Sequence, residues 1–270
     1  MRGSPLGWTL LKEDRRVAMD LPAESAASMR DVAKLVAVPS DVRIAEPEQA
    51  RKMEVQIAGI DFSNFELEGA GQRLIDPENG LVRIVMERPA AGAPLPIREA
   101  SLAEFLKPTV LIQSDDAAIL KLAQRIAEGE TDSLAVADRI NQWVFDNIHK
   151  KITFSLPSAV EVLDTREGDC NEHTTLYVAL ARAAGIPAKA AIGLVYHKGH
   201  FYYHAWPEVY VGQWIAMDPT LGQPLADATH IKLLEGELYQ QAKLVQAIGK
   251  LKLSIKSVAY PPPVTPGKSI

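Results

Sequence analysis

Cys170 is the only cysteine in this 270-residue chain, and it limits how the chain can fold. A single thiol cannot form an internal disulfide, so a scaffold held together by disulfides is excluded. Stability must therefore come from a buried apolar core, and hydrophobic residues make up 47% of the sequence. A chain of this length can bury such a core in one or two domains.

The charge balance excludes some kinds of partner. The chain has 29 basic and 34 acidic side chains, for a net charge of −5, which provides no basic surface for nucleic acid. No stretch reaches the about 18 apolar residues of a membrane span. The residues after Met1 lack the apolar core of a signal peptide. We therefore expect neither a nucleic-acid partner nor a membrane span in this chain.

The first hundred residues show the periodicity of strands. Apolar and polar residues alternate over 53–57 and again over 82–86, and residues 76–80 between them have the composition of a turn. These patterns predict a small β-rich unit over residues 1–100. Its end, residues 89–96, is rich in proline and alanine, which is typical of a linker.

Helical periodicity follows. Apolar residues recur at three- and four-residue steps over 119–126 and 134–148, which predicts two helices joined by a short turn. A further helix is predicted over 235–251 and a proline-rich tail over 259–270. Together these elements indicate a second domain over residues 101–258.

Cys170 precedes a predicted helix. Apolar residues have helical spacing over 176–183, so the thiol would lie at a helix N-terminus, where backbone N–H groups favour the nucleophilic thiolate. The alternative is a buried cysteine that acts as a small apolar filler. The polar neighbours Asp169, Asn171 and Glu172 argue against simple burial, and we expect Glu172 to be solvated.

A histidine and a carboxylate follow on predicted strands. His204 lies in an aromatic strand-like segment, and Asp218 lies at the end of the next one. A three-residue connection, 211–213, would pair Trp206 with Asp218. His204 would then be a diagonal neighbour of Asp218 on the same face, with Cα atoms roughly 7–8 Å apart. A two-residue connection would place the two on opposite faces and favour a purely structural histidine, so we predict the longer connection.

These three side chains have the chemistry of an activated nucleophile. Cys170 would attack a carbonyl carbon. His204 would take its proton, or share it as a thiolate–imidazolium pair, and later protonate the leaving amine, and Asp218 would fix the imidazole tautomer. The backbone N–H of Cys170 is the predicted donor to the oxyanion.

Four segments, in this order, resemble the transglutaminase-like superfamily and more narrowly its bacterial branch. They are 165–174, 182–189, 204–209 and 218–220. The resemblance covers about residues 101–235. It implies an α+β fold in which a papain-like core, with the nucleophile helix packed on an antiparallel sheet, follows the small β-rich unit. It also implies Cys170, His204 and Asp218 as the catalytic triad of the 101–258 domain.

Two positions depart from the family pattern. Pro207 stands where members usually have a β-branched residue, and Lys150-Lys151-Ile152 stands where many members have a tyrosine. The resemblance implies no obligatory cofactor.

Other side chains near the triad are candidates for binding. Trp206 and His173 are the predicted contacts with substrate. Trp206 would form the core and cleft wall, and His173, one helical turn after Cys170, would line the site or lie on the surface. The spacing of His197, His200 and His204 suits a zinc site only on a helix. The aromatic, glycine-containing segment around them favours a strand, so we expect no metal.

The residues and the resemblance together predict a thiol-dependent acyl-transfer enzyme that acts on amide bonds of peptides or proteins. Hydrolysis, as in a cysteine peptidase or amidase, is favoured. Transfer to a lysine amine, as in a transglutaminase that cross-links proteins, is the alternative, because one triad serves both reactions. A non-catalytic module that binds peptide or glycan on the same fold is the third hypothesis. For a bacterial member we expect the cytoplasm or the periplasm, and the sequence leaves the oligomeric state open.

Overall fold

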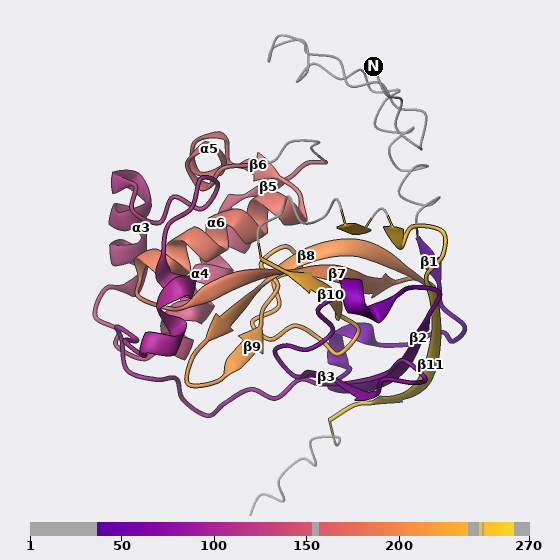
Figure 1. Ribbon diagram of the computed structural model, residues 1–270. Coiled ribbons are helices and arrows are strands. Elements are labelled where there is room, and N and C mark those ends of the chain that lie inside the picture. The colour runs from indigo at the N-terminus through magenta and orange to yellow at the C-terminus, as the bar shows by residue number, and fades with distance from the viewer. Residues whose placement is uncertain (1–36, 153–156, 237–242, 245, 262–270) are drawn as a thin grey trace, which may run out of the picture. The chain divides into compact units, whose positions relative to one another are not determined.

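A computed structural model describes residues 37–152, 157–236, 243–244 and 246–261 (Figure 1). The helices are α3 (Ala117–Ala127), α4 (Ser133–Asn147), α5 (Ala159–Thr165) and α6 (Cys170–Ala183). The described residues also include the short 3-10 helices η1 (Pro47–Gln49), η2 (Phe62–Asn64) and η3 (Ala100–Leu106). The two helices predicted around 119–126 and 134–148 are thereby confirmed.

Strands come both before and after the helices. The first are β1 (Val38–Pro39), β2 (Lys52–Ala58), β3 (Gln72–Asp76) and β4 (Leu81–Val85). The others are β5 (His149–Lys150), β6 (Glu167–Gly168), β7 (Ala188–His197), β8 (His200–Tyr210), β9 (Trp214–Ala216), β10 (Ile231–Glu235) and β11 (Lys252–Ala259). The predicted α+β class is confirmed.

Two antiparallel sheets carry the fold. One has the order β1-β8-β7-β10, with β9 paired to β8, and the other has the order β11-β2-β4-β3. A short parallel pair, β5 and β6, leads into α6. Strands β2 and β4 match the two alternating segments of the sequence, whereas β3 lacks a regular alternation and was not predicted.

Strand β11 joins the sheet of the N-terminal region. It pairs with β2 from Lys252 opposite Ala58 to Ala259 opposite Lys52. The sheet predicted for residues 1–100 therefore contains a strand from much later in the chain, and the domain boundary at residue 100 stays a prediction. The tail predicted from residue 259 starts at the last residue of β11.

Some predicted segments lie outside the described residues. These are the start of the N-terminal unit, residues 1–36, and most of the tail, residues 262–270. Residues 237–242 and 245 of the helix predicted over 235–251 are also outside. The described residues of this range contradict a continuous helix, because Glu235 ends β10 and residues 243–244 and 246 form 3-10 turns that are followed by a turn at 247–250. In the described part of the chain, no helix combines the length and the apolar character that crossing a membrane requires.

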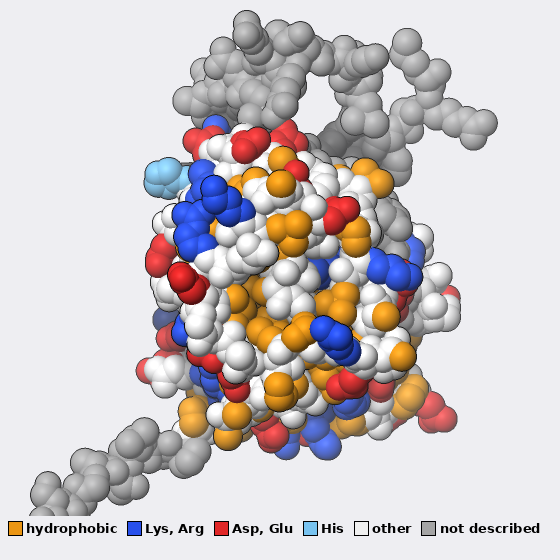
Figure 2. All heavy atoms as spheres, turned by 90° about the vertical axis from the view of Figure 1, so that its left-hand side faces the viewer, with side chains coloured by type: hydrophobic (Ala, Val, Ile, Leu, Met, Phe, Trp, Pro, Cys, Tyr) orange, Lys and Arg blue, Asp and Glu red, His pale blue; other side chains and the backbone are white. Residues whose placement is uncertain are grey.

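The apolar core has two parts. One lies between the two sheets and includes Met53, Ile84, Leu194 and Phe201, each at most 1% exposed. The other lies among the helices and the end of the β8–β9 hairpin. Figure 1 shows the helices gathered on the left, beside β7 and β8, with β2, β3 and β11 on the right. The face that the helices present carries charges of both signs around apolar side chains (Figure 2).

Strands β7 and β10 approach each other closely at a glycine. Gly193 lies opposite Lys232, and a Cβ on Gly193 would come within 2.0 Å of the carbonyl oxygen of Ile231. Any larger residue must therefore push β10 away from β7. The glycine is needed here because of the neighbouring backbone and not because of its own φ angle.

We predict that Gly193→Ala lowers the free energy of unfolding by about 1–3 kcal/mol, because the methyl group forces the backbone of β10 to shift. Urea unfolding measures this loss. Gly199→Ala is the control, since Gly199 has φ 89° but no atom within 4 Å of the added Cβ. It reports the cost of a left-handed residue alone, about 1–2 kcal/mol. Wild-type stability of Gly193→Ala would contradict the close approach of the strands.

Candidate active site

Cys170 is the first residue of α6, and the turn before it is tightly held. The Asp169 side chain accepts a hydrogen bond from Asn171 N at 2.9 Å, and Glu172 Oε2 accepts one from Asp169 N at 2.9 Å. This capping box fixes the start of the helix and therefore the position of the thiol. The expectation that Glu172 is solvated was wrong: it is 3% exposed, because it closes the box and packs against Gly168.

The connection between β8 and β9 has the predicted length. Tyr210 lies opposite Trp214, which leaves residues 211–213 as a three-residue connection. The register places His204 and Asp218 on one face, and their side chains meet. His204 Nε2 lies 2.8 Å from Asp218 Oδ2.

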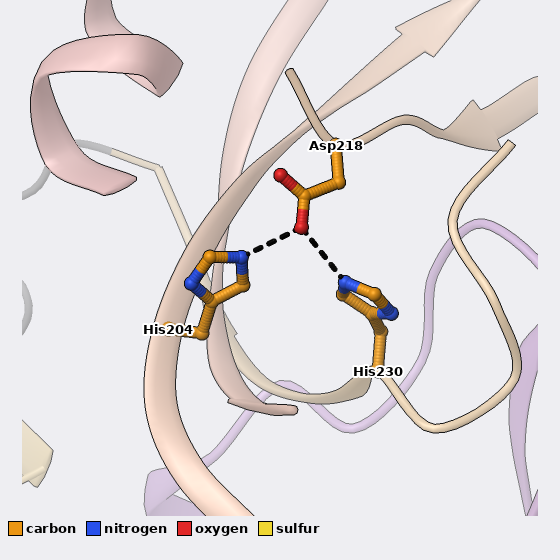
Figure 3. Close-up of side chains that lie close together, drawn as sticks. All are labelled: His204, Asp218 and His230. Atoms are coloured by element: carbon orange, nitrogen blue, oxygen red, sulfur yellow. Dashed lines mark hydrogen bonds and ion pairs between the residues drawn. The ribbon is translucent and has the colours of Figure 1, made fainter. Parts of the chain in front are cut away.

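Asp218 is fully buried and accepts hydrogen bonds on both carboxylate oxygens (Figure 3). Oδ1 accepts from the backbone N–H groups of Thr220 at 2.8 Å and Leu221 at 3.0 Å. Oδ2 accepts from His204 Nε2 at 2.8 Å and His230 Nε2 at 3.1 Å. Burial raises the pKa of this carboxyl, but the two histidines outweigh burial and hold the pKa well below its usual range. Asp218 is therefore a carboxylate.

The bond to Asp218 sets the tautomer of His204. A carboxylate can only accept, so Nε2 of His204 carries a hydrogen, and in the neutral ring Nδ1 keeps its lone pair. The ring is 9% exposed and stacks on Trp206, with centroids 6.1 Å apart and planes 23° apart. Nδ1 is therefore the ring atom that can take a proton.

The environment of Cys170 disfavours a free thiolate. Burial raises the pKa of the thiol, and the carboxylates of Asp169 and Asp218 raise it further. The N–H of Ala205, hydrogen-bonded to the sulfur, acts in the opposite direction but is weaker than burial. The predicted position at a helix N-terminus is confirmed, whereas the expected preference for thiolate is contradicted, because burial and the neighbouring carboxylates raise the pKa of the thiol. The sulfur becomes nucleophilic when a base takes its proton.

Cys170 and His204 border the same pocket. Its volume is about 420 Å³. Apolar and aromatic side chains form much of its wall, and two lysines lie at one side. These residues are Ile152, Val195, Tyr196, Leu221, Lys150 and Lys151. Ile152 and Leu221 are 49% and 47% exposed, so apolar surface reaches solvent beside the thiol.

The two predicted substrate contacts lie elsewhere. Trp206 is 1% exposed, and its ring lies against both His204 and His230. His173 is fully buried, with Nδ1 2.6 Å from the carbonyl oxygen of Asp169. Neither side chain borders the pocket of Cys170, so their predicted contact with substrate stays a prediction, and Trp206 instead supports the histidine rings.

His230 belongs to the site but was not predicted from the sequence. The available signal was its position three residues after Asp227, and that pattern alone does not indicate which carboxylate it meets. Within the described ranges, His204, Asp218 and His230 are the group whose side chains could surround a metal ion. Their separations of 2.8 and 3.1 Å are those of hydrogen bonds, which account for the cluster. The strand predicted around His197 and His200 is confirmed, and both residues lie on the β7–β8 hairpin.

Comparison with known proteins finds one family model and several solved structures similar to this chain. Residues 120–219, which include all three triad candidates, match the model of the transglutaminase-like superfamily. No curated protein matches the chain in sequence. A candidate cysteine protease from Cytophaga hutchinsonii has a similar structure, with 20% identity, a TM-score of 0.50 and coverage of 77% of this chain and 86% of that one. The periplasmic domain of TgpA from Pseudomonas aeruginosa, at 15% identity, has a TM-score of 0.43 and coverage of 71% and 91%.

The helix-on-sheet core around Cys170 is thus that of a papain-like cysteine enzyme fold. The match covers 100 of the 270 residues and confirms the resemblance to the transglutaminase-like superfamily that the sequence segments predicted.

We predict that the partly buried thiol of Cys170 makes stability depend on alkaline pH. Because the folded pKa of Cys170 lies above the ~8.5 of a free cysteine, the folded state keeps its proton while the unfolded state loses it. Stability is therefore retained below pH about 8.5 and falls above it, by at most about 1.4 kcal/mol per pH unit. Urea unfolding of wild type and Cys170→Ala between pH 7 and 10 isolates this effect, since all other groups are shared. Parallel curves would contradict a raised thiol pKa.

Proposed function

We propose that this protein is a thiol-dependent acyl-transfer enzyme that cleaves amide bonds in peptides or proteins through an acyl-enzyme on Cys170. The observation that supports this most directly is the hydrogen bond from His204 Nε2 to Asp218. It leaves Nδ1 as the base in a ring that borders the same pocket as the thiol. The pKa of Asp218 is lowered, so Asp218 stays ionised when His204 takes the proton.

The first half-reaction forms a thioester. Cys170 Sγ attacks the amide carbonyl carbon while His204 Nδ1 takes the thiol proton. Because the pKa of the thiol is raised, attack accompanies this proton transfer and does not start from a standing thiolate. Asp218 stabilises the imidazolium that forms. The backbone N–H of Cys170, at the first position of α6, is the donor that we assign to the oxyanion.

The second half-reaction restores the thiol. When the tetrahedral intermediate collapses, the C–N bond breaks and the imidazolium of His204 gives its proton to the leaving amine. Water then attacks the thioester carbonyl while His204 takes a proton from it. The C–S bond breaks, a carboxylic acid leaves, and the proton returns to Cys170 Sγ.

The pocket wall supports a substrate with apolar side chains. Ile152 and Leu221 offer exposed apolar surface on the described rim, and Val195 and Tyr196 continue it inward. Burying an apolar side chain there is favourable by about 25 cal/mol per Å². A peptide segment with an apolar residue near the scissile bond fits this surface better than a glycan does.

Two alternatives remain within the same fold. Transfer to a lysine amine uses the same triad but requires a second site that holds the amine and keeps water out. Hydrolysis needs no such site, and we therefore favour it. A non-catalytic binding module would not need the bond between His204 and Asp218.

We predict that His204→Ala slows alkylation of Cys170 by iodoacetamide at pH 7 by about 10²-fold or more, because the base that activates the thiol is lost. Mass spectrometry of the intact protein measures the rate without ambiguity, since the chain has one cysteine. His200→Gln, on the same strand but exposed, is the control. Equal rates in wild type and His204→Ala would favour the binding module.

We predict that the acyl acceptor is water. A library of peptides with apolar residues, incubated with the protein and an excess of a primary amine, should yield new carboxyl termini and no amine adducts. Cys170→Ala should yield neither product. Amine adducts that depend on Cys170 would instead establish transfer, and the absence of both products in wild type would count against the enzyme.

A further inference from the structure

His230 connects the triad carboxylate to a second buried carboxylate. It lies immediately before β10 and is 1% exposed. Its Nε2 lies 3.1 Å from Asp218 Oδ2, and its Nδ1 lies 3.0 Å from the carbonyl oxygen and 3.4 Å from Oδ1 of Asp227. Asp218 therefore lies between two imidazole rings, as Figure 3 shows.

Asp227 is itself held in place. It is 2% exposed, and its Oδ1 accepts from Thr229 N at 2.8 Å and Thr229 Oγ1 at 2.6 Å. Its Oδ2 accepts from Gln223 Nε2 at 2.8 Å. The backbone of Gln223 pairs with that of Asp218 through two hydrogen bonds of 2.8 and 2.9 Å. This loop therefore fixes both carboxylates relative to each other.

Two buried carboxylates this close require a positive charge nearby. Burial lowers the pKa of His230, but Asp227 and Asp218 outweigh burial and raise the pKa to about 10. The His204 ring faces His230 with centroids 5.8 Å apart, and the edge-on Trp206 ring contributes no charge. On the adjoining strands, the charged groups Lys232 and Glu208 pair with each other at 3.3 Å.

We propose that His230 is a positioning residue of the active site, an imidazolium that aims the Asp218 carboxylate at His204 and keeps His204 unprotonated in the resting state. The inference rests on the proposed function and extends the triad to a chain of Cys170, His204, Asp218, His230 and Asp227. Both of its effects follow from the geometry. The N–H of His230 occupies one lone pair of Oδ2, which orients the carboxylate, and its charge opposes a second proton on the neighbouring ring.

An unprotonated His204 is consistent with a protonated thiol at Cys170. A base must have a free lone pair before the reaction starts, and the thiol of Cys170 is protonated at that point. A positive charge beyond Asp218 favours the neutral pair of thiol and imidazole over the pair of thiolate and imidazolium. A purely structural His230 would affect stability but not the protonation of His204.

Two measurements on the full chain test the proposal. The first is an NMR titration of the wild-type protein with isotope-labelled histidine, in which the signal absent from His230→Gln assigns His230. We expect its ring to carry both N–H protons from pH 6 to 9 and to titrate near pH 10. A neutral His230 ring at pH 7 would overturn the proposal.

The second measurement is the pH profile of Cys170 alkylation in wild type, His230→Gln and His200→Gln. Glutamine retains an N–H donor but removes the charge. We therefore expect the acid limb of the profile, the low-pH range in which the alkylation rate falls, to move about one unit to higher pH. At a given pH on that limb, the rate would be about tenfold slower. The exposed His200→Gln should keep the wild-type limb. A folded His230→Gln with the wild-type limb would overturn the positioning role.

His204→Ala separates failure of this proposal from failure of the proposed function. If the acid limb of the alkylation profile disappears in His204→Ala but does not move in His230→Gln, the result supports the triad and contradicts the positioning role of His230. If His204→Ala keeps the wild-type profile, the proposed function falls, and the positioning role falls with it.

Discussion

A carboxylate without access to water is the constraint on which the rest of this site depends. Removing Asp218 from solvent is costly unless hydrogen bonds and positive charge replace the lost hydration. Two backbone N–H groups and two histidine rings supply that replacement. The loop after β9, strand β8 and the residue before β10 must therefore meet at one point, and the arrangement of the five-stranded sheet is what brings them there.

The side chains of the proposed triad come from three different elements, and each element is held by its own local structure. The capping box fixes Cys170 at the start of α6, the pairing of β7 with β8 fixes His204, and the β8–β9 connection fixes Asp218. Because these supports are independent, the geometry of the candidate site does not depend on a bound substrate. Such preorganisation would limit the reorganisation that the proposed reaction requires.

The features that depend on residues close together in the sequence could be predicted from it. The helix that starts at Cys170 and the three-residue connection between β8 and β9 follow from local spacing and from the need to place two side chains on one face. Burial could not be predicted, because it depends on contacts made in the folded state. The solvated Glu172 and the favoured thiolate were wrong for that reason. His230 was missed because its partner, Asp218, is reached only when the intervening loop closes.

Strand β11 has a consequence for how the protein is made. One edge of β2 obtains its hydrogen-bonding partner from residues that leave the ribosome after every other described strand. Until then, the backbone N–H and C=O groups on that edge have no strand beside them, although β3 and β4 are already available on the other side. An open strand edge is a site where nascent chains can associate. The last strand therefore covers this edge of β2 and becomes the outer strand of the sheet itself, so the edge that is open during synthesis differs from the edge that is open in the folded protein.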